Sequence, residues 1–203
     1  MKKLIIKTAF IIIIAFLIPI LFTRKFKINE TSSSKIEEKE PFDYGKYSTI
    51  KLLHSETGDV ENLGLDTYLY GVVSAEMPAS YELEALKAQA VVARTYTIYK
   101  ILNGSKHENA DICDNPNCCQ AWISKENRFA RWENENKDEN WQKIVTAVDS
   151  TAGNYITYNG EPINALFHSN SGGKTELPIN VWGGNYPYLA SVETNRRRWI
   201  FYL

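Results

Sequence analysis

The pattern of apolar and polar positions divides the chain into an apolar N-terminal run, a short polar stretch and a mixed remainder. Residues 4–22 form a 19-residue run in which Lys7 is the single charged side chain. A helix of that length can cross a bilayer. No small-residue cleavage motif follows, so we predict an uncleaved membrane anchor at residues 1–27 rather than a signal peptide. Residues 28–40 predict a flexible tether, and residues 41–203 the folded domain.

Helical periodicity is clearest in the middle of the folded part. Apolar residues recur at helical spacing from Leu83 to Ala93, which predicts a long helix over residues 80–102. Ser80 is the expected N-cap. The Asn-Gly pair at 103–104 is typical of a helix C-terminus.

An acidic residue, Glu76, lies just before this helix. Pro78 cannot occupy a helix interior, so the chain must break after the acid, and we expect the residues from Leu69 up to Glu76 to form a short apolar strand or turn. The apolar neighbours Val73 and Met77 would desolvate the carboxyl in part, which favours its protonated form. Glu76 is therefore a candidate general acid, and the alternative is a solvated charge at a helix end.

Two basic residues of the predicted helix, Lys87 and Arg94, are seven residues apart and share one stripe. They are either an exposed cationic face or a pair of cations beside Glu76. In the second case we expect them to bind substrate oxygens.

Four potential metal ligands lie within 13 residues: His107, Cys113, Cys118 and Cys119. Thiolate and imidazole ligands suit zinc, although the spacing is not that of a zinc finger. A disulfide or a cluster of free thiols would account for the same residues. Three ligands would leave one zinc position open, whereas four would close the site.

A β-hairpin is predicted around the Asn-Gly turn at 159–160, with strands on either side up to residue 167. It leads into His168, Ser169 and Ser171, followed by two glycines that allow backbone to approach a ligand. A tight turn with a core histidine is the alternative. No nucleophile-elbow pattern surrounds either serine, which argues against a serine hydrolase.

The fold class expected is α+β, a mixed domain with more strand than helix and one long central helix.

Charge is distributed unevenly along the chain. Six of the 23 basic residues fall within residues 1–27, which hold no acid, so the rest has 17 basic against 24 acidic side chains. The formal net charge of residues 28–203 is therefore −7, which makes sequence-independent nucleic-acid binding a poor hypothesis for this domain. Lys2 and Lys3 favour a cytoplasmic N-terminus, which would place the domain on the outer face of the membrane.

Five stretches of the chain are similar to the SpoIID/LytB family and follow one another in the family's order. They are TYLYGVVSAEMP, EALKAQAVVARTY, ICDNPNCCQAW, AVDSTAGNYITYNGEPINALFHSNSGGKTE and VWGGNYPYLASVE. The resemblance implies a membrane-anchored lytic transglycosylase that cuts peptidoglycan during engulfment in endospore formation. It also implies three partners: the glycan strands, a sporulation amidase/endopeptidase, and the membrane anchor protein of that enzyme.

The resemblance also implies roles for individual residues. Glu76 matches the catalytic acid of the Glu-Met-Pro motif, and one strong carboxylate candidate suits a lytic transglycosylase, which need not activate water. Residues expected in or near the substrate cleft are Lys87, Arg94, His168, Ser169 and Ser171. Members from anaerobic spore formers resemble this chain in having a histidine–cysteine zinc site, which His107, Cys113 and Cys119 fit. Whether Cys118 joins that site or is incidental stays open.

The end of the chain departs from the family pattern. Family members continue well past the Pro-Tyr-Leu-x-Ser-Val motif, and residues 195–203 do not resemble the usual continuation. We therefore expect a truncated or frameshifted C-terminus. Two other functions remain alternatives, a non-catalytic amidase enhancer and an inactive fragment.

Overall fold

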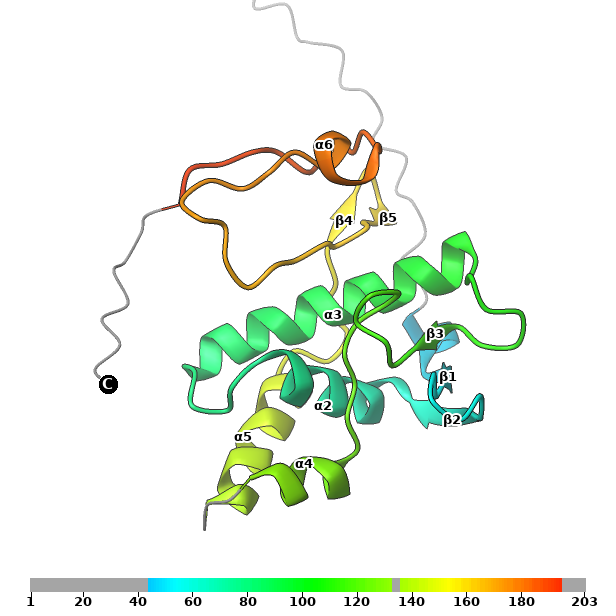
Figure 1. The fold of residues 1–203 in the computed structure, drawn as a ribbon, viewed down its shortest axis with the longest axis vertical. Helices are drawn as coiled ribbons and strands as arrows, with labels where there is room; N and C mark the ends of the chain where they lie inside the picture. The colour runs from blue at the N-terminus through cyan, green and yellow to red at the C-terminus, as the bar shows by residue number, and fades with distance from the viewer. Residues whose placement is uncertain (1–43, 133–135, 195–203) are drawn as a thin grey trace, which may run out of the picture. The chain divides into compact units, whose positions relative to one another are not determined.

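The computed structural model describes residues 44–132 and 136–194 of the chain, all within the unit formed by residues 42–203 (Figure 1). The predicted anchor at residues 1–27 and tether at residues 28–40 lie outside the described residues, as does the predicted C-terminal departure at 195–203. Across the described ranges, no helix is long and apolar enough to span a bilayer.

A small sheet follows the short 3₁₀ helix η1 (Tyr44–Tyr47). Its central strand β1 (Thr49–Leu53) pairs antiparallel with β2 (Val60–Gly64) and parallel with β3 (Ile112–Cys113). In β1, Ile50 and Leu52 are fully buried and alternate with Thr49 and Lys51, which are exposed.

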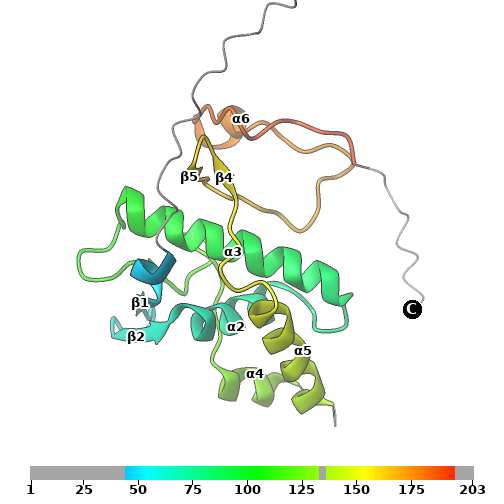
Figure 2. The same ribbon diagram turned by 180° about the vertical axis from the view of Figure 1, so that it is seen from behind.

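Helices make up most of the rest. α2 (Leu65–Glu76), α3 (Leu83–Asn103) and α5 (Lys137–Asp149) pack against one another, and α4 (Lys125–Arg131) contacts α2. Figures 1 and 2 both show α3 crossing the domain, with α2 and α5 beside one of its faces. The predicted long central helix is confirmed, including its end at Asn103 with Gly104 at φ 87°.

The core lies between these helices and β1. Its fully buried apolar side chains come from β1, α2, α3, β3 and α5: Ile50, Leu52, Tyr68, Leu69, Val72, Val73, Leu86, Ala90, Ala93, Ile112, Ile144, Ala147 and Val148. Close packing also fixes Gly71 on α2, because a Cβ there would lie 2.8 Å from the carbonyl oxygen of Ile123 and would collide with the Trp122 ring.

Three expectations were wrong. The residues from Leu69 to Glu76 are helical as part of α2, because Leu65, Leu69 and Val72 recur at a period that buries one helix face. Ser80 is not the N-cap of α3: residues 78–81 form a turn closed by Tyr81 N–H to Pro78 O (3.1 Å), and Glu82 precedes the helix. The α+β class is confirmed, but the described residues contain more helix than strand.

The predicted hairpin forms with shorter strands than expected. β4 (Thr157–Tyr158) pairs with β5 (Glu161–Pro162) around Asn159 (φ 53°) and Gly160 (φ 81°). Two consecutive residues with positive φ are the requirement of a type I′ turn, which Asn-Gly meets. β5 packs on α3, and the chain then continues as a loop to residue 169.

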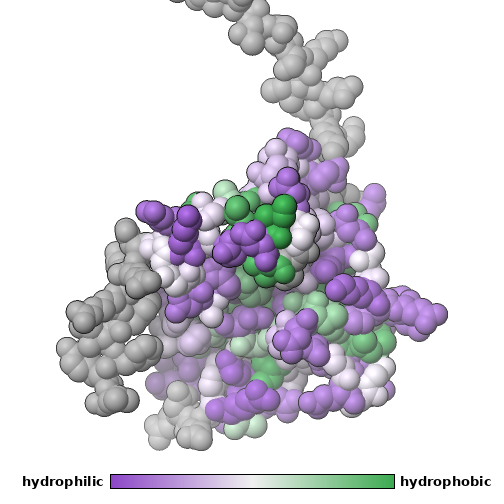
Figure 3. Space-filling model, turned by 45° about the horizontal axis from the view of Figure 1, so that its top comes forward, coloured by the Kyte–Doolittle hydropathy of each residue, from purple (hydrophilic) through white to green (hydrophobic). Residues whose placement is uncertain are grey.

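α6 (Pro178–Trp182) is a short helix near the end of the described chain. Figure 3 shows apolar surface gathered on the face where α6 lies, and Ile179 and Val181 are 55% and 52% exposed. α6 therefore contributes little apolar area to the core.

Candidate active site and metal centre

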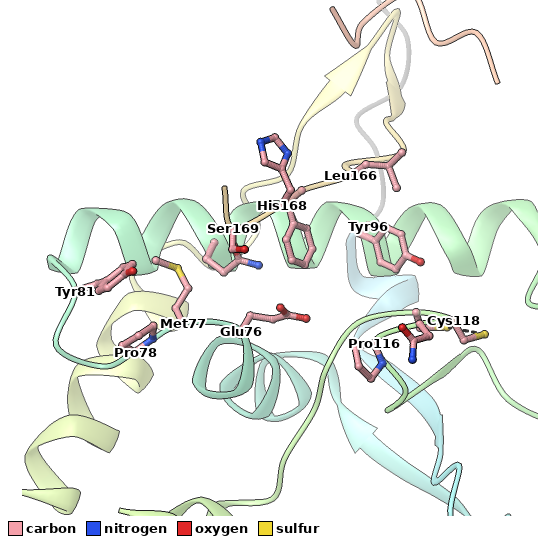
Figure 4. A pocket seen from close by; sticks show the side chains of 14 residues that line it. Glu76, Met77, Pro78, Tyr81, Tyr96, Pro116, Cys118, Leu166, His168 and Ser169 are labelled. Atoms are coloured by element: carbon pink, nitrogen blue, oxygen red, sulfur yellow. Dashed lines mark hydrogen bonds between the residues drawn. The ribbon is translucent and has the colours of Figure 1, made fainter. Parts of the chain in front are cut away.

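Glu76 is the last residue of α2, and the helix ends there for a local reason. Met77 adopts extended backbone angles (φ −132°, ψ 140°), as expected of a residue that precedes proline. The predicted break before Pro78 is thus confirmed. The Glu76 side chain projects into a cavity of about 590 Å³ (Figure 4).

The Glu76 carboxyl is held at one oxygen. Oε1 accepts a hydrogen bond from the backbone N–H of Ala121 at 2.7 Å. Within residues 44–132 and 136–194, Oε2 has no hydrogen-bond partner, and Glu76 is the only carboxylate that lines the cavity. One carboxyl oxygen is therefore positioned by the protein, and the other is available to a ligand.

Three segments form the walls of the cavity. Gln89 and Tyr96 come from α3, residues 116–119 from the loop after β3, and residues 166–169 from the loop after β5. His168 and Ser169 both line the cavity and are exposed, but the His168 ring points away from Glu76 in Figure 4. Both could meet a ligand that fills the cavity, without touching the acid.

Ser171 is placed differently. Its hydroxyl is 2.5 Å from Thr194 Oγ1 and accepts a hydrogen bond from Gly173 N–H at 3.2 Å. It closes the glycine turn at 172–173, where both glycines have positive φ, and is not part of the cavity wall. The tight-turn alternative describes this residue best.

The two predicted cations are not brought to the cavity. Lys87 Nζ lies 2.7 Å from Glu84 Oε1 on the surface of α3. Neither Lys87 nor Arg94 lines the cavity. Seven-residue spacing does place them on one stripe, but that stripe does not line the cavity.

Arg94 has no accessible surface and makes a network of structural hydrogen bonds. Its guanidinium donates to Asp66 Oδ1 (3.2 Å), Thr151 Oγ1 (3.2 Å) and the carbonyl oxygens of Val148 (3.1 Å) and Asn154 (3.3 Å). A buried charge requires such partners. In this conformation Arg94 joins α3 to α2 and to the end of α5, and it cannot contact a substrate.

The four potential metal ligands converge. Ligand atoms of His107, Cys113, Cys118 and Cys119 all lie within 4.8 Å of one another. His107 Nε2 is 3.6 Å from Cys118 Sγ and 3.8 Å from Cys119 Sγ, and the two sulfurs are 3.9 Å apart. Tetrahedral zinc with ordinary bond lengths requires about 3.6 Å between nitrogen and sulfur and about 3.8 Å between sulfurs. The residues present therefore fit a four-ligand zinc site, with Cys118 included.

The chemistry of the cluster agrees with its geometry. Burial, together with the neighbouring Cys113 and Cys118 thiols, raises the pKa of the Cys119 thiol to about 12. Cysteine binds metal as thiolate, so a divalent cation would supply the charge that stabilises three thiolates in one place. All three cysteines are free of disulfides, which disfavours the disulfide alternative.

Comparison with known proteins identifies the family. Residues 54–158 match the sequence model of SpoIID, described as a stage II sporulation protein. The chain is 32% identical to stage II sporulation protein D of Bacillus subtilis (strain 168), over 96% of this chain and 60% of that protein. The chain belongs to the SpoIID family. The family predicted from the motifs is confirmed.

Other SpoIID relatives show how far the likeness extends. The chain is 34% identical to stage II sporulation protein D of Bacillus amyloliquefaciens, over 72% of this chain and 43% of that protein. It is 37% identical to the amidase enhancer of Bacillus subtilis, over 60% of this chain and 14% of that protein. This SpoIID-family chain thus spans about 43–60% of the length of the two sporulation relatives.

The sequence patterns do not single out three residues that line the cavity of this SpoIID-family protein: Tyr81, Gln89 and Tyr96. Gln89 Nε2 is buried and has no hydrogen-bond partner among the described residues. Gln89 and Tyr96 are seven residues apart, just as Lys87 and Arg94 are. Helical periodicity applied to the neighbouring stripe of α3 would have identified Gln89 and Tyr96 as residues on one helix face.

Proposed function

We propose that this SpoIID-family protein is a peptidoglycan lytic transglycosylase that cuts the bond between N-acetylmuramic acid and N-acetylglucosamine. One observation carries the proposal: of the described residues that line the cavity, a single one, Glu76, has a carboxylate. Hydrolytic glycosidases use two carboxylates, because water must be activated or a covalent intermediate formed. A lytic transglycosylase can use one, since its nucleophile belongs to the substrate.

Glu76 performs both proton transfers in this mechanism. Its protonated carboxyl first gives a proton to the glycosidic oxygen as the bond to the anomeric carbon breaks. The 6-hydroxyl of the same N-acetylmuramic acid then attacks the anomeric carbon, and the Glu76 carboxylate takes the hydroxyl proton. The products are a 1,6-anhydro end and a free 4-hydroxyl on N-acetylglucosamine, with no water consumed. The Ala121 N–H holds Oε1, so Oε2 is the oxygen that we assign to proton transfer.

Substrate contacts come from the walls around Glu76. His168 and Ser169 are exposed at the cavity and present hydrogen-bonding groups of the kind that bind sugar hydroxyls. Gln89 supports the same role, because a glycan hydroxyl or acetamido oxygen would accept from its unpaired amide.

Zinc would be held by His107, Cys113, Cys118 and Cys119. A site with four protein ligands has no open position, so the ion would supply folding stability rather than Lewis acidity. Two of its ligands, Cys118 and Cys119, lie on the loop after β3 that also carries Pro116 and Asn117 into the cavity wall. The chain's own residues, and not the ion, perform each step above.

The cellular setting follows from the family and the N-terminal sequence. We place the protein at the cell membrane through residues 1–27, with the folded domain on the outer face in the mother cell, toward the forespore. There it would cut glycan strands during engulfment together with a sporulation amidase/endopeptidase and its membrane anchor protein. The apolar run at residues 4–22 and the family membership support this setting.

Products distinguish this reaction from hydrolysis. Purified protein should release 1,6-anhydro-muropeptides from sacculi, detected by mass spectrometry as fragments that lack one water. Glu76→Gln should lower the rate by at least about 100-fold, the lower end of what general acid–base catalysis contributes. Glu84→Gln, an exposed acid paired with Lys87, is the matched control and should leave the rate unchanged. Reducing-end products, or full activity of Glu76→Gln, would refute the proposal.

A second candidate function is enhancement of an amidase without cleavage, favoured by the 37% identity to the amidase enhancer of Bacillus subtilis. Under this alternative, purified protein releases no anhydro product alone but raises the rate of an added amidase. Glu76→Gln would then retain the enhancement in full.

A further inference from the structure

A second hollow, of about 440 Å³, lies where the C-terminal end of α3 meets the β4–β5 hairpin. None of its lining residues lines the cavity at Glu76. Figures 1 and 2 show the hairpin beside the C-terminal half of α3 in both views. The mechanism proposed above uses no residue of this hollow.

Tyrosine rings form one side of the hollow. Tyr158 and Tyr188 have ring centroids 5.5 Å apart, and Tyr99 of α3 lines the same hollow. Tyr186 extends the group, with its centroid 5.7 Å from that of Tyr188. Burial and the nearby hydroxyls of Tyr186 and Tyr188 raise the pKa of Tyr99, which reflects how closely these residues gather.

These rings are held in place but remain reachable. The Tyr188 hydroxyl accepts a hydrogen bond from Asn164 N–H at 3.1 Å, and the Tyr186 hydroxyl accepts from Asn164 Nδ2 at 3.3 Å. Tyr158 is 42% exposed. Its backbone position is fixed by the tight turn that begins at the next residue, Asn159. A rigid aromatic surface open to solvent loses little conformational entropy when a flat ligand stacks on it.

The polar groups of the hollow select among ligands. Asn103, Asn159 and Glu161 also line it, and none of its described lining residues is Lys or Arg. Asn103 Nδ2 donates one hydrogen bond to Tyr99 O at 2.9 Å, which leaves its second N–H and its amide oxygen for a ligand. A site without a cation does not favour phosphate or an acidic peptide. Rings that offer an apolar face, beside amides that bind hydroxyls, suit a neutral pyranose, whose faces carry C–H groups and whose edge carries oxygens.

The hollow lies along the same helix as the cavity. Gln89 and Tyr96 line the cavity, and Asn103, a further seven residues along α3, lines the hollow. Seven residues advance a helix by about 10 Å, with little rotation, so the two sites lie on one stripe of α3. The chain from β4 through residue 169 runs from the hollow to the cavity as well.

We propose that the hollow between α3 and the β4–β5 hairpin is a second saccharide-binding site, which takes a pyranose ring of the glycan strand at a distance from the cleaved linkage. The inference rests on the proposed function, because a long polymeric substrate is what gives a remote subsite its use. Binding there adds affinity for long strands and none for fragments that fill only the cavity.

Binding measured without cleavage tests the site. In a Glu76→Gln background, which prevents turnover, we compare binding of long peptide-free glycan strands and of a disaccharide released from them. Tyr158→Ala should weaken binding of the long strands about three- to tenfold, as expected for one lost aromatic contact, and leave the disaccharide unaffected. Tyr158→Phe, which keeps the ring, should bind within twofold of the parent. Val60→Ala, on β2 and 41% exposed, is the control for removing an apolar surface side chain.

NMR signals of side-chain amides give an independent measurement of binding at the hollow. Titration of the Glu76→Gln protein with the long strands should shift the side-chain NH₂ resonances of Asn103 and Asn159. Unchanged long-strand binding by Tyr158→Ala, or no shift at either asparagine, overturns the second site even if Glu76 is the catalytic acid. The two proposals can also fail separately. If the wild-type protein yields no anhydro product but strand binding still depends on Tyr158, the second site is supported and the proposed reaction is refuted. Absence of any strand binding overturns the second site.

Discussion

The backbone N–H of Ala121 donates a hydrogen bond to Glu76 Oε1 across 2.7 Å, and Ala121 follows Cys119 by two residues. The intervening Gln120 is buried and donates to Tyr68 Oη (2.9 Å) and Thr97 Oγ1 (3.0 Å). The segment that carries the candidate metal ligands Cys118 and Cys119 is thus fixed to α2 and α3, and it positions the candidate acid directly. Any change that moves this loop is expected to move the carboxyl.

Removing the acceptor at Glu76 should therefore cost stability as well as activity. Glu76→Ala leaves the part-buried Ala121 N–H without a partner, which we expect to lower the free energy of unfolding by about 1–2 kcal/mol. Glu76→Gln keeps a carbonyl oxygen that can accept the same bond, so its loss should be under about 0.5 kcal/mol. Urea unfolding of both variants measures the difference. Equal stabilities would mean that the Ala121 bond contributes nothing.

The fourth ligand of the metal cluster can be tested by metal content. We expect about one zinc per chain in reduced protein, and its removal by a chelator should lower the melting temperature, since an ion that binds only the folded state stabilises it. Cys118→Ala should lose most of the zinc at equal free concentration, as Cys113→Ala does. If Cys118→Ala keeps full zinc while Cys113→Ala does not, the site has three protein ligands. Elemental analysis without activity measurements decides the question.

The buried position of Arg94 predicts a structural role. Arg94→Met should lower the free energy of unfolding by about 2–4 kcal/mol, because Asp66, Thr151 and two carbonyl groups lose a donor together. Arg94→Lys should recover part of that, since an ammonium cannot reach all four acceptors. Activity per folded molecule should stay unchanged in both. A large rise in KM of Arg94→Lys at full folding would instead support the substrate contact that the family resemblance implies.

Alkaline pH should destabilise the fold through Tyr68. Burial raises the pKa of Tyr68 well above its ordinary value of 10.0, so the folded protein keeps a phenolic proton that the unfolded chain releases. Its contribution to stability is therefore complete below about pH 10 and declines as the pH rises above that value. Urea unfolding between about pH 9 and pH 11 should show the decline. Tyr68→Phe should make it shallower, at a cost of about 1 kcal/mol near neutral pH from the lost hydrogen bond between Gln120 Nε2 and the Tyr68 hydroxyl.

Local signals were sufficient for several elements. Helical spacing of apolar residues identified α3, the Asn-Gly pair identified the β4–β5 turn, and Pro78 identified the chain break after Glu76. Each depends on dihedral preferences or on a short apolar period, which are properties of neighbouring residues. α2 was missed, although its buried residues Leu65, Leu69 and Val72 have helical spacing.

The sequence by itself determined the family, the break at Glu76, the long helix α3 and three candidate metal ligands, His107, Cys113 and Cys119, because these depend on residue type and on short spacings. Only the tertiary structure decided which stripe of α3 faces the cavity, so that Gln89 and Tyr96 line it while Arg94 is buried against Asp66. The same holds for the inclusion of Cys118 in the cluster and for the Ala121 bond to Glu76. Periodicity gives the positions that share a helix face, but the face that is covered depends on the elements that pack against it from elsewhere in the chain.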